Sequence, residues 1–214
     1  MPKTTAPLLS FGASGQIGKT LVASKWRGRP YMRQYVIPSN PQSSEQTLTR
    51  SAFSWLQSVF KTAPALFIEP WTAYSTGKVM YNRNAFTKFN LPVLREETDL
   101  ANFIMSPGAL GGLPPASVSA AAGNDIITVT ITAPAVLPTG WTIHSAIAAC
   151  IIDQDPQSDS DYTITAGSDA TSTYEVVLSG LSAVPYVVGG WLKWNRPDGK
   201  FAYSPALYDT ATPT

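Results

Sequence analysis

The 214-residue sequence is poor in charged residues, cysteine and histidine. Lys, Arg, Asp and Glu together make up 14% of the chain, whereas soluble domains average about 25%. A surface with so few charges suits a protein that sits against partners better than a free cytosolic enzyme. Cys150 and His144 are the single residues of their kinds, so the chain provides neither an intramolecular disulfide nor a Cys/His zinc site.

Long apolar runs are also absent. The longest, residues 146–152, is much shorter than the roughly 20 residues that a membrane-spanning helix needs. No apolar stretch of the kind found in secretory signals follows Lys3. We therefore expect a soluble, unprocessed protein that makes no contact with a membrane.

The net charge of +1 is the sum of two oppositely charged halves. Residues 1–100 contain 12 Lys and Arg against 5 Asp and Glu, whereas residues 101–214 contain 3 against 9. Hydrophobic residues, at 44% of the chain, are sufficient for a packed core. The charge division predicts that a basic attachment part and an acidic displayed part are separate.

Glycine and proline punctuate the first 40 residues. Four glycines and four prolines lie among them, a density that disfavours long helices. Residues 31–36 alternate enough to form one strand. We therefore expect an extended basic arm over residues 1–40.

The clearest helical pattern follows this arm. Apolar residues recur at three- and four-residue spacing from Leu48 to Phe60, and Pro64 ends the pattern. A second helix is expected over residues 73–89. We therefore predict a helical anchoring segment over residues 41–112.

Beyond the Gly- and Pro-rich residues 111–115, the apolar period changes to two, which indicates strands. Turn signals separate the strands at the intervals of a β-sandwich. The expected strands are residues 126–131, 142–152, 162–165, 174–178, 186–194 and 200–207, with Trp141, Tyr186, Trp191 and Trp194 as core or rim bulk. The predicted fold is mainly β with a small helical part, and the sandwich occupies residues 113–214.

Residues 13–20 match the loose pattern of a phosphate-binding loop. Lys19 and Thr20 would there contact phosphate and Mg²⁺, and residues 147–153 resemble the apolar strand that ends in the metal-binding Asp. However, such a loop needs a buried strand before it and a long helix after it. Because glycine and proline interrupt both flanks, we do not expect nucleotide hydrolysis.

Two short acidic runs are candidates for metal binding. They are Glu96, Glu97 and Asp99, and then Asp153, Asp155, Asp159 and Asp161. The second run lacks the turn glycine and the final glutamate of a calcium loop. We expect both to be solvated loops, or the first to be a partner of the basic arm. His144 is expected to be an ordinary strand residue, and no metal or cofactor is predicted.

The strongest local signal is a run of cations interleaved with aromatic residues. The candidate partner-binding residues are Lys25, Trp26, Arg27, Arg29, Tyr31, Arg33 and, further along, Arg50. Arginine and tryptophan anchor protein interfaces, although cations and aromatic rings also bind nucleic acids. Because the run is short and no nucleic-acid-binding fold surrounds it, a protein interface is favoured and nucleic acid is an unlikely partner.

The spacing of these residues resembles an uncharacterised family of bacteriophage and prophage virion proteins. The matching order is Gly15–x–x–Gly18, then Trp26–Arg27–Gly28–x–x–Tyr31–x–Arg33, then Asn40–Pro41–x–Ser43–x–x–Gln46–x–x–x–Arg50, with Ser43 where Thr is more usual. The C-terminal part is similar in layout to immunoglobulin-like and fibronectin type III sandwiches. Residues 174–181, followed by Tyr186, carry that likeness.

The resemblance implies a virion structural protein without catalytic activity. It would be a capsid decoration or minor capsid component, present in multiple copies and held on the major capsid protein or another virion protein by its basic N-terminal region. One alternative is a tail, neck or fibre-anchoring component. Another is a module that binds carbohydrate at a host surface through exposed Trp191, Trp194 and Tyr203.

Overall fold

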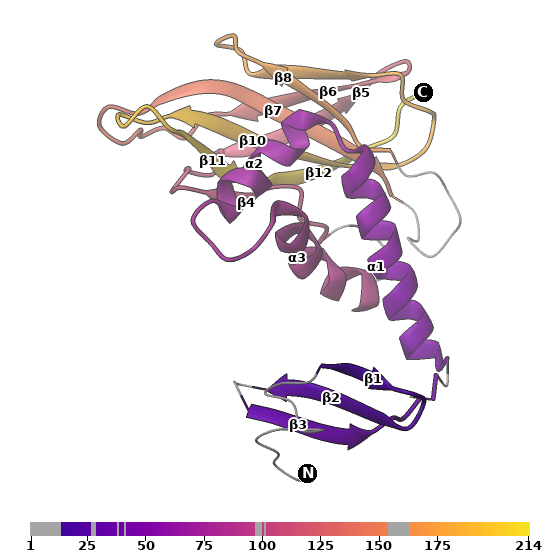
Figure 1. Ribbon diagram of the computed structural model, residues 1–214. Coiled ribbons are helices and arrows are strands. Elements are labelled where there is room, and N and C mark those ends of the chain that lie inside the picture. The colour runs from indigo at the N-terminus through magenta and orange to yellow at the C-terminus, as the bar shows by residue number, and fades with distance from the viewer. Residues whose placement is uncertain are drawn as a thin grey trace. The chain divides into compact units, whose positions relative to one another are not determined.

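The computed structural model describes residues 14–26, 29–37, 39–40, 42–96, 100, 102–153 and 163–214 (Figure 1). The chain divides into two compact units, Met1–Ser43 and Ser44–Thr214. The architecture is mainly β, with several antiparallel sheets and three helices in the described residues. The predicted fold class is confirmed at this level.

The first unit contains a small antiparallel sheet. Its strands are β1 (Gly15–Ile17), β2 (Leu21–Trp26) and β3 (Arg29–Gln34), in the order β1-β2-β3. The expectation of an extended arm is therefore wrong for these residues, because the breakers do not prevent strand pairing: Gly15 and Pro30 lie within strands and Gly18 lies in a turn. Gly18 has a φ of +54° in the β1–β2 turn, a conformation that glycine adopts without strain.

In the sheet as described, β3 is an edge strand, and its outer edge lacks a hydrogen-bond donor at Pro30. Tyr35 donates its backbone N–H to Thr20 over 2.7 Å, so alternate β3 residues bond toward β2 and Pro30 is one of those whose nitrogen points the other way. Proline has no N–H, and this is the position in a sheet where it is tolerated.

The helices of the second unit are α1 (Ser44–Thr62), α2 (Ala65–Ser75) and α3 (Asn82–Glu96). The predicted end of the first helix before Pro64 is confirmed. The predicted helix over residues 73–89 is wrong, because it joins the end of α2 to the start of α3. Gly77, with a φ of +77°, lies in the break between them.

Strands fill the rest of the second unit. They are β4 (Pro107–Ala109), β5 (Ser117–Ala122), β6 (Ile126–Thr132), β7 (Thr142–Ile152), β8 (Thr165–Asp169), β9 (Glu175–Ser179), β10 (Tyr186–Asn195), β11 (Phe201–Pro205) and β12 (Leu207–Ala211). A six-stranded sheet has the order β4-β11-β10-β7-β8, and β12 also pairs with β10. A second sheet has the order β5-β6-β9.

Two hydrophobic cores lie on opposite faces of the six-stranded sheet. Ile147 and Trp191 belong to the core shared with the helices. Their neighbours Ala148 and Leu192 belong to the core shared with β5, β6 and β9. The second unit therefore has three layers, with the helices on one side of the six-stranded sheet and the three-stranded sheet on the other (Figure 1). Burial on both faces explains why β7 and β10 contain continuous apolar runs.

The predicted boundary near residues 111–115 lies inside this unit. One core joins α1, α2 and α3 to β7, β10 and β11, so the segments 41–112 and 113–214 fold together. Gly112 is required there by packing, because a Cβ atom would lie 2.3 Å from the backbone carbonyl of Tyr203. The glycine signal marks a close approach of two backbones and not a linker.

Adjacent glycines allow both outer layers to approach β10. A Cβ atom at Gly189 would lie 2.7 Å from the sulfur of Met105, on the helical side. A Cβ atom at Gly190 would lie 2.9 Å from Val118 and 3.0 Å from Ile131, on the side of the three-stranded sheet. The centre of β10 is therefore closely packed on both faces.

Candidate partner-binding surfaces

The β2–β3 hairpin divides the predicted basic cluster between two faces. Paired residues of antiparallel strands share a face, and alternate residues of one strand share a face. Arg29, Tyr31 and Arg33 therefore lie on one face of β3. Lys25 pairs with Pro30 and lies on the opposite face. Both arginines are exposed and Tyr31 is half-buried, so an Arg–Tyr–Arg row is the part of the cluster that the strands bring together.

The remaining predicted residues are not part of this row as far as the structure describes them. Trp26 ends β2 and its backbone pairs with Arg29, but its side chain and Arg27 lie outside the described residues. Arg50 is exposed on α1 and belongs to the second unit.

The first unit is basic without any compensating acid in its sequence. Residues 1–43 contain six Lys and Arg, whereas the first acidic residue of the chain is Glu45. Residues 96–192 show the reverse, because they contain no Lys or Arg. An anionic partner surface would therefore meet no repulsive side chain in the sequence of the first unit.

A second basic surface, of which only Arg50 was predicted from the sequence, follows the exposed side of α1 and α3. The two helices are joined by a hydrogen bond of 2.8 Å from the Gln57 amide to the Thr87 hydroxyl. Arg50 and Lys61 lie on the same stripe of α1 as Gln57. The three exposed cations of α3 are Arg83, Lys88 and Arg95. The helical spacing of Arg50, Gln57 and Lys61 could have been recognised in the sequence. That α1 packs beside α3 could not.

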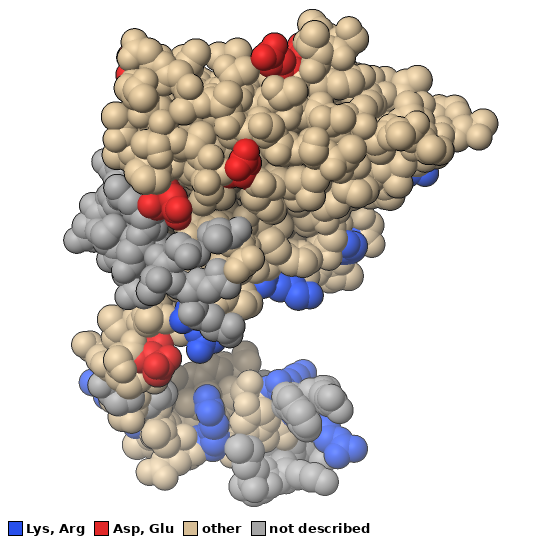
Figure 2. Space-filling view, turned by 180° about the vertical axis from the view of Figure 1, so that it is seen from behind, with Lys and Arg blue, Asp and Glu red and all other residues tan. Residues whose placement is uncertain are grey.

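In the second unit, positively and negatively charged side chains lie mainly on different layers. Figure 2 shows Lys and Arg gathered mainly over the helical part and Asp and Glu scattered over the sheets. The outward positions of the β5-β6-β9 sheet are mostly Ser and Thr, with Glu175 as the acidic side chain among the exposed strand residues. The helical face is the more strongly charged of the two outer layers.

The aromatic residues expected to bind carbohydrate are buried. Trp191 and Trp194 have no exposed surface, and Tyr203 is 5% exposed. Trp191 contacts Phe67 of α2, edge to face at 6.4 Å between ring centroids. The expectation of exposed stacking residues is therefore wrong, because helices and the second sheet cover both faces of β10.

A shallow groove of about 650 Å³ lies between α2 and the β10–β11 hairpin. Two of its charged side chains, Lys193 and Glu69, pair with each other, and the exposed Lys200 also lines it. Lys193 donates to Glu69 over 2.8 Å, and its ammonium lies 4.4 Å from the centroid of the Phe201 ring. Tyr203 donates its hydroxyl to Glu69 over 3.0 Å, and burial, reinforced by that carboxylate, raises the pKa of Tyr203. The contacts of Glu69 therefore join α2 to β10 and β11 across this groove.

The phosphate-loop pattern forms a β-hairpin turn. Gly18, Lys19 and Thr20 connect β1 to β2, and the Thr20 hydroxyl donates to the carbonyl of Ile17 over 3.1 Å. No helix occurs within residues 14–34 where they are described. In the described residues the pattern therefore lies on a hairpin turn and not at the start of a helix, where backbone N–H groups would point at a phosphate.

The acidic runs form no metal cluster in the part of the chain that the structure describes. Asp153 accepts a hydrogen bond from the Leu100 backbone over 3.3 Å. Most of the other acidic candidates lie outside the described residues, namely Glu97, Asp99, Asp155, Asp159 and Asp161. His144 lies on the strand predicted for it and packs against Phe201, with 4.9 Å between ring centroids.

Within the described residues, no helix has both the length and the apolar character required to cross a membrane. No protein-family model matches the sequence, and no curated protein matches it. Among solved structures, one described as "Myokine structure" is similar over 48% of this chain and 98% of its own, at 19% identity and a TM-score of 0.33. A similarity at this level carries no argument about fold or function.

Proposed function

We propose that the protein is a non-enzymatic structural component of a bacteriophage virion, attached by its basic N-terminal unit. The observation that carries the proposal is the Arg29–Tyr31–Arg33 row on a sheet whose sequence contains no acid. Both hydrophobic cores lie in the other unit. Attachment and display are thus assigned to different units of one chain, as a capsid decoration or minor capsid component requires. A tail, neck or fibre-anchoring position uses the same arrangement.

The displayed part in this proposal is an immunoglobulin- or fibronectin-III-like sandwich, made by the β5-β6-β9 sheet and the six-stranded sheet. Their shared core supports it. The helices cover the outer face of the larger sheet. Many copies on a repeating lattice would add avidity to a weak contact made by each Arg–Tyr–Arg row.

Co-sedimentation of the full chain with purified particles of the phage that encodes it tests the proposal. The wild-type chain should sediment with the particles, and Arg33→Glu should weaken binding about tenfold. Lys200→Glu is the matched control, because it reverses one exposed cation at the far end of the β10–β11 hairpin. If the wild-type chain does not bind any virion component, the function is wrong. If Arg33→Glu and Lys200→Glu bind alike, the row is not the anchor.

A further inference from the structure

The paired helices α1 and α3 carry exposed cations along their lengths, and this set of residues is termed the basic seam below. Its exposed members are Arg50, Phe53 and Lys61 on α1 and Arg83, Lys88 and Arg95 on α3, and the half-buried Gln57 and the buried Thr87 join the two helices beneath them. The two helices contain five Lys and Arg against two acidic residues, Glu45 and Glu96, which lie at the start of α1 and the end of α3. The middle of the seam therefore carries only positive charge.

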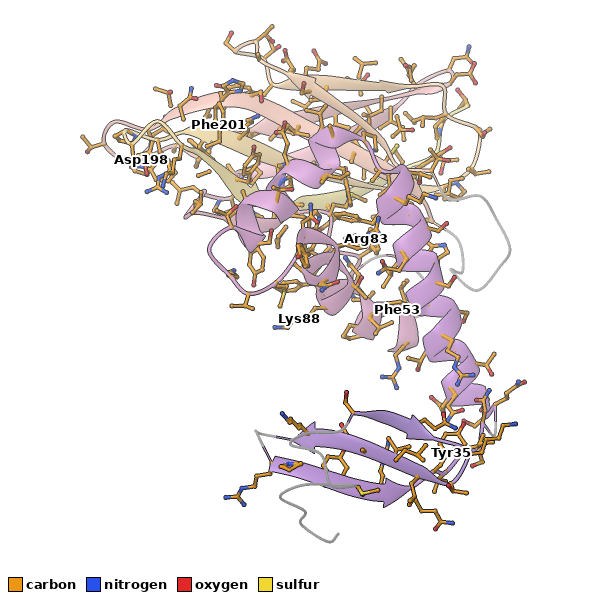
Figure 3. All side chains as sticks on the ribbon, viewed as in Figure 1. Tyr35, Phe53, Arg83, Lys88, Asp198 and Phe201 are labelled. Carbon is orange, nitrogen blue, oxygen red and sulfur yellow. The ribbon has the colours of Figure 1, made fainter. Side chains whose placement is uncertain are left out.

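An aromatic ring lies among these cations. Phe53 is 49% exposed, although its neighbours Ala52 and Leu56 are buried in the core. It precedes Gln57 by one helical turn on the side of α1 that faces α3 (Figure 3). Tyr81, which is 80% exposed, comes directly before α3. Exposed aromatic side chains flanked by arginine have the composition of an interface centre and not of a solvated helix face.

The helical surface is also rigidly supported. The Arg83 guanidinium lies 6.0 Å from the ring of the buried Phe60, and the Gln57–Thr87 hydrogen bond holds the helices together one turn further along. Beneath them, Phe60 and Phe86 pack with ring centroids 5.1 Å apart. Because the helices are fixed to each other, the backbone positions that carry the cations keep their spacing when a partner binds.

We propose that the basic seam binds an acidic protein surface that places an apolar or aromatic side chain against Phe53. The charge surplus selects an acidic partner. A protein fits better than a nucleic acid because the surplus is small and a single large ring lies within the seam, whereas single-strand binding uses several stacking rings along a strongly cationic groove. This inference concerns the second unit and does not depend on the virion proposal.

The test measures how tightly three polyanions of equal charge bind to the full chain. The chain carries Arg29→Glu and Arg33→Glu, so that the first unit contributes little to binding. The probes are poly-glutamate, a 4:1 glutamate–tyrosine copolymer, and single-stranded DNA. The copolymer should bind about fivefold more tightly than poly-glutamate. The double variant Arg83→Glu/Lys88→Glu should bind both polypeptides about tenfold more weakly. Phe53→Ser should only abolish the difference in affinity between the copolymer and poly-glutamate. Lys200→Glu should change neither.

Three results would overturn the inference. They are the absence of polypeptide binding, equal binding by the Arg83→Glu/Lys88→Glu and Lys200→Glu variants, and tighter binding of DNA than of the copolymer. Unchanged thermal unfolding of Phe53→Ser and of the double reversal shows that any loss reflects the surface and not the fold. Since no virion is used, a negative result here leaves the particle experiment unaffected.

Discussion

Lys193 on β10 and Glu69 on α2 form an ion pair with 2.8 Å between Nζ and Oε2, which joins the helical layer to the six-stranded sheet. The lysine side chain is 12% exposed and the glutamate side chain is 35% exposed. Lys193 therefore depends on its partner more than Glu69 does. A buried charge left without its partner costs more than the intact pair gains.

Glu69→Gln should accordingly lower the free energy of unfolding by about 1–2 kcal/mol. Lys193→Met removes the charge that Glu69→Gln leaves uncompensated. The double variant should therefore lose less than the sum of the two single variants. Urea unfolding of the four proteins measures this coupling, and additive losses would contradict the role given to the pair.

The close approach of the three-stranded sheet to Gly190 gives a second prediction. Gly190→Ala should destabilise the protein by about 1–3 kcal/mol, because its Cβ atom would meet Val118 and Ile131. Ile131→Val removes the Cδ1 atom that lies 3.0 Å away and should restore part of the loss when combined with Gly190→Ala. Chemical denaturation provides the measurement. No recovery in the double variant would show that the inner face of β6 does not limit the space at Gly190.

Asn90 gives a third prediction through its buried hydrogen bonds. Its amide donates to the carbonyls of Phe86 and Ile104 over 3.2 and 3.1 Å, and its carbonyl accepts from the Ile104 N–H over 2.7 Å. Asn90→Ala should cost about 2–3 kcal/mol, because these backbone groups lose their partner away from water. The exposed Asn84 on the same helix is the matched control, and its replacement by Ala should change the melting temperature little. Equal effects at the two positions would be inconsistent with this bridge.

Alkaline pH should destabilise the second unit. Burial raises the pKa of Cys150 from 9.0 to about 12. Burial also raises the pKa of Tyr208 from 10.0 to about 12, against the opposing effect of the Met105 N–H that donates to its hydroxyl. The folded state therefore keeps protons that the unfolded chain loses, and stability falls as pH rises from about 9 to about 12.

The contribution of the cysteine is separable with Cys150→Ala. Each buried group adds at most about 1.4 kcal/mol per pH unit to the slope, so the variant should lose stability less steeply between pH 9 and pH 11. Urea unfolding at a series of pH values measures the two slopes. Parallel slopes for the variant and the wild-type chain would mean that the thiol takes no part.

Strand positions were more predictable from sequence than the packing of the strands. The predicted strand over residues 142–152 coincides with β7, and the strand predicted over residues 186–194 matches β10 to within one residue. Period and length are local properties, so the sequence contains them directly. Whether one or both faces of a strand are buried depends on distant segments. For that reason the sequence left Trp191 and Trp194 open between core and rim positions, and the structure buries both.

Proline and glycine were the main sources of error, because each has more than one structural use. Pro64 ends one helical pattern, but it is also the N-cap residue of α2, where its φ of −61° is the angle that the proline ring imposes. In the sequence, Gly112 belongs to a Gly- and Pro-rich stretch that suggested a linker. In the structure, it allows the backbone to approach that of Tyr203. On the candidate surface, the sequence identified Arg29, Tyr31 and Arg33. It could not identify Phe53 or Arg83, because nothing local shows that α1 lies beside α3.

The missing donor at Pro30 has a consequence for how newly made copies meet. An open strand edge is a template for strand exchange when many copies are present at high concentration. A gap in the donor row of β3 interrupts that template within the described sheet. Contacts through the arginine side chains are weakened by salt, whereas a backbone ladder between chains is far harder to undo. The small sheet is therefore less prone to backbone pairing along the β3 edge than a strand with an unbroken row of donors would be.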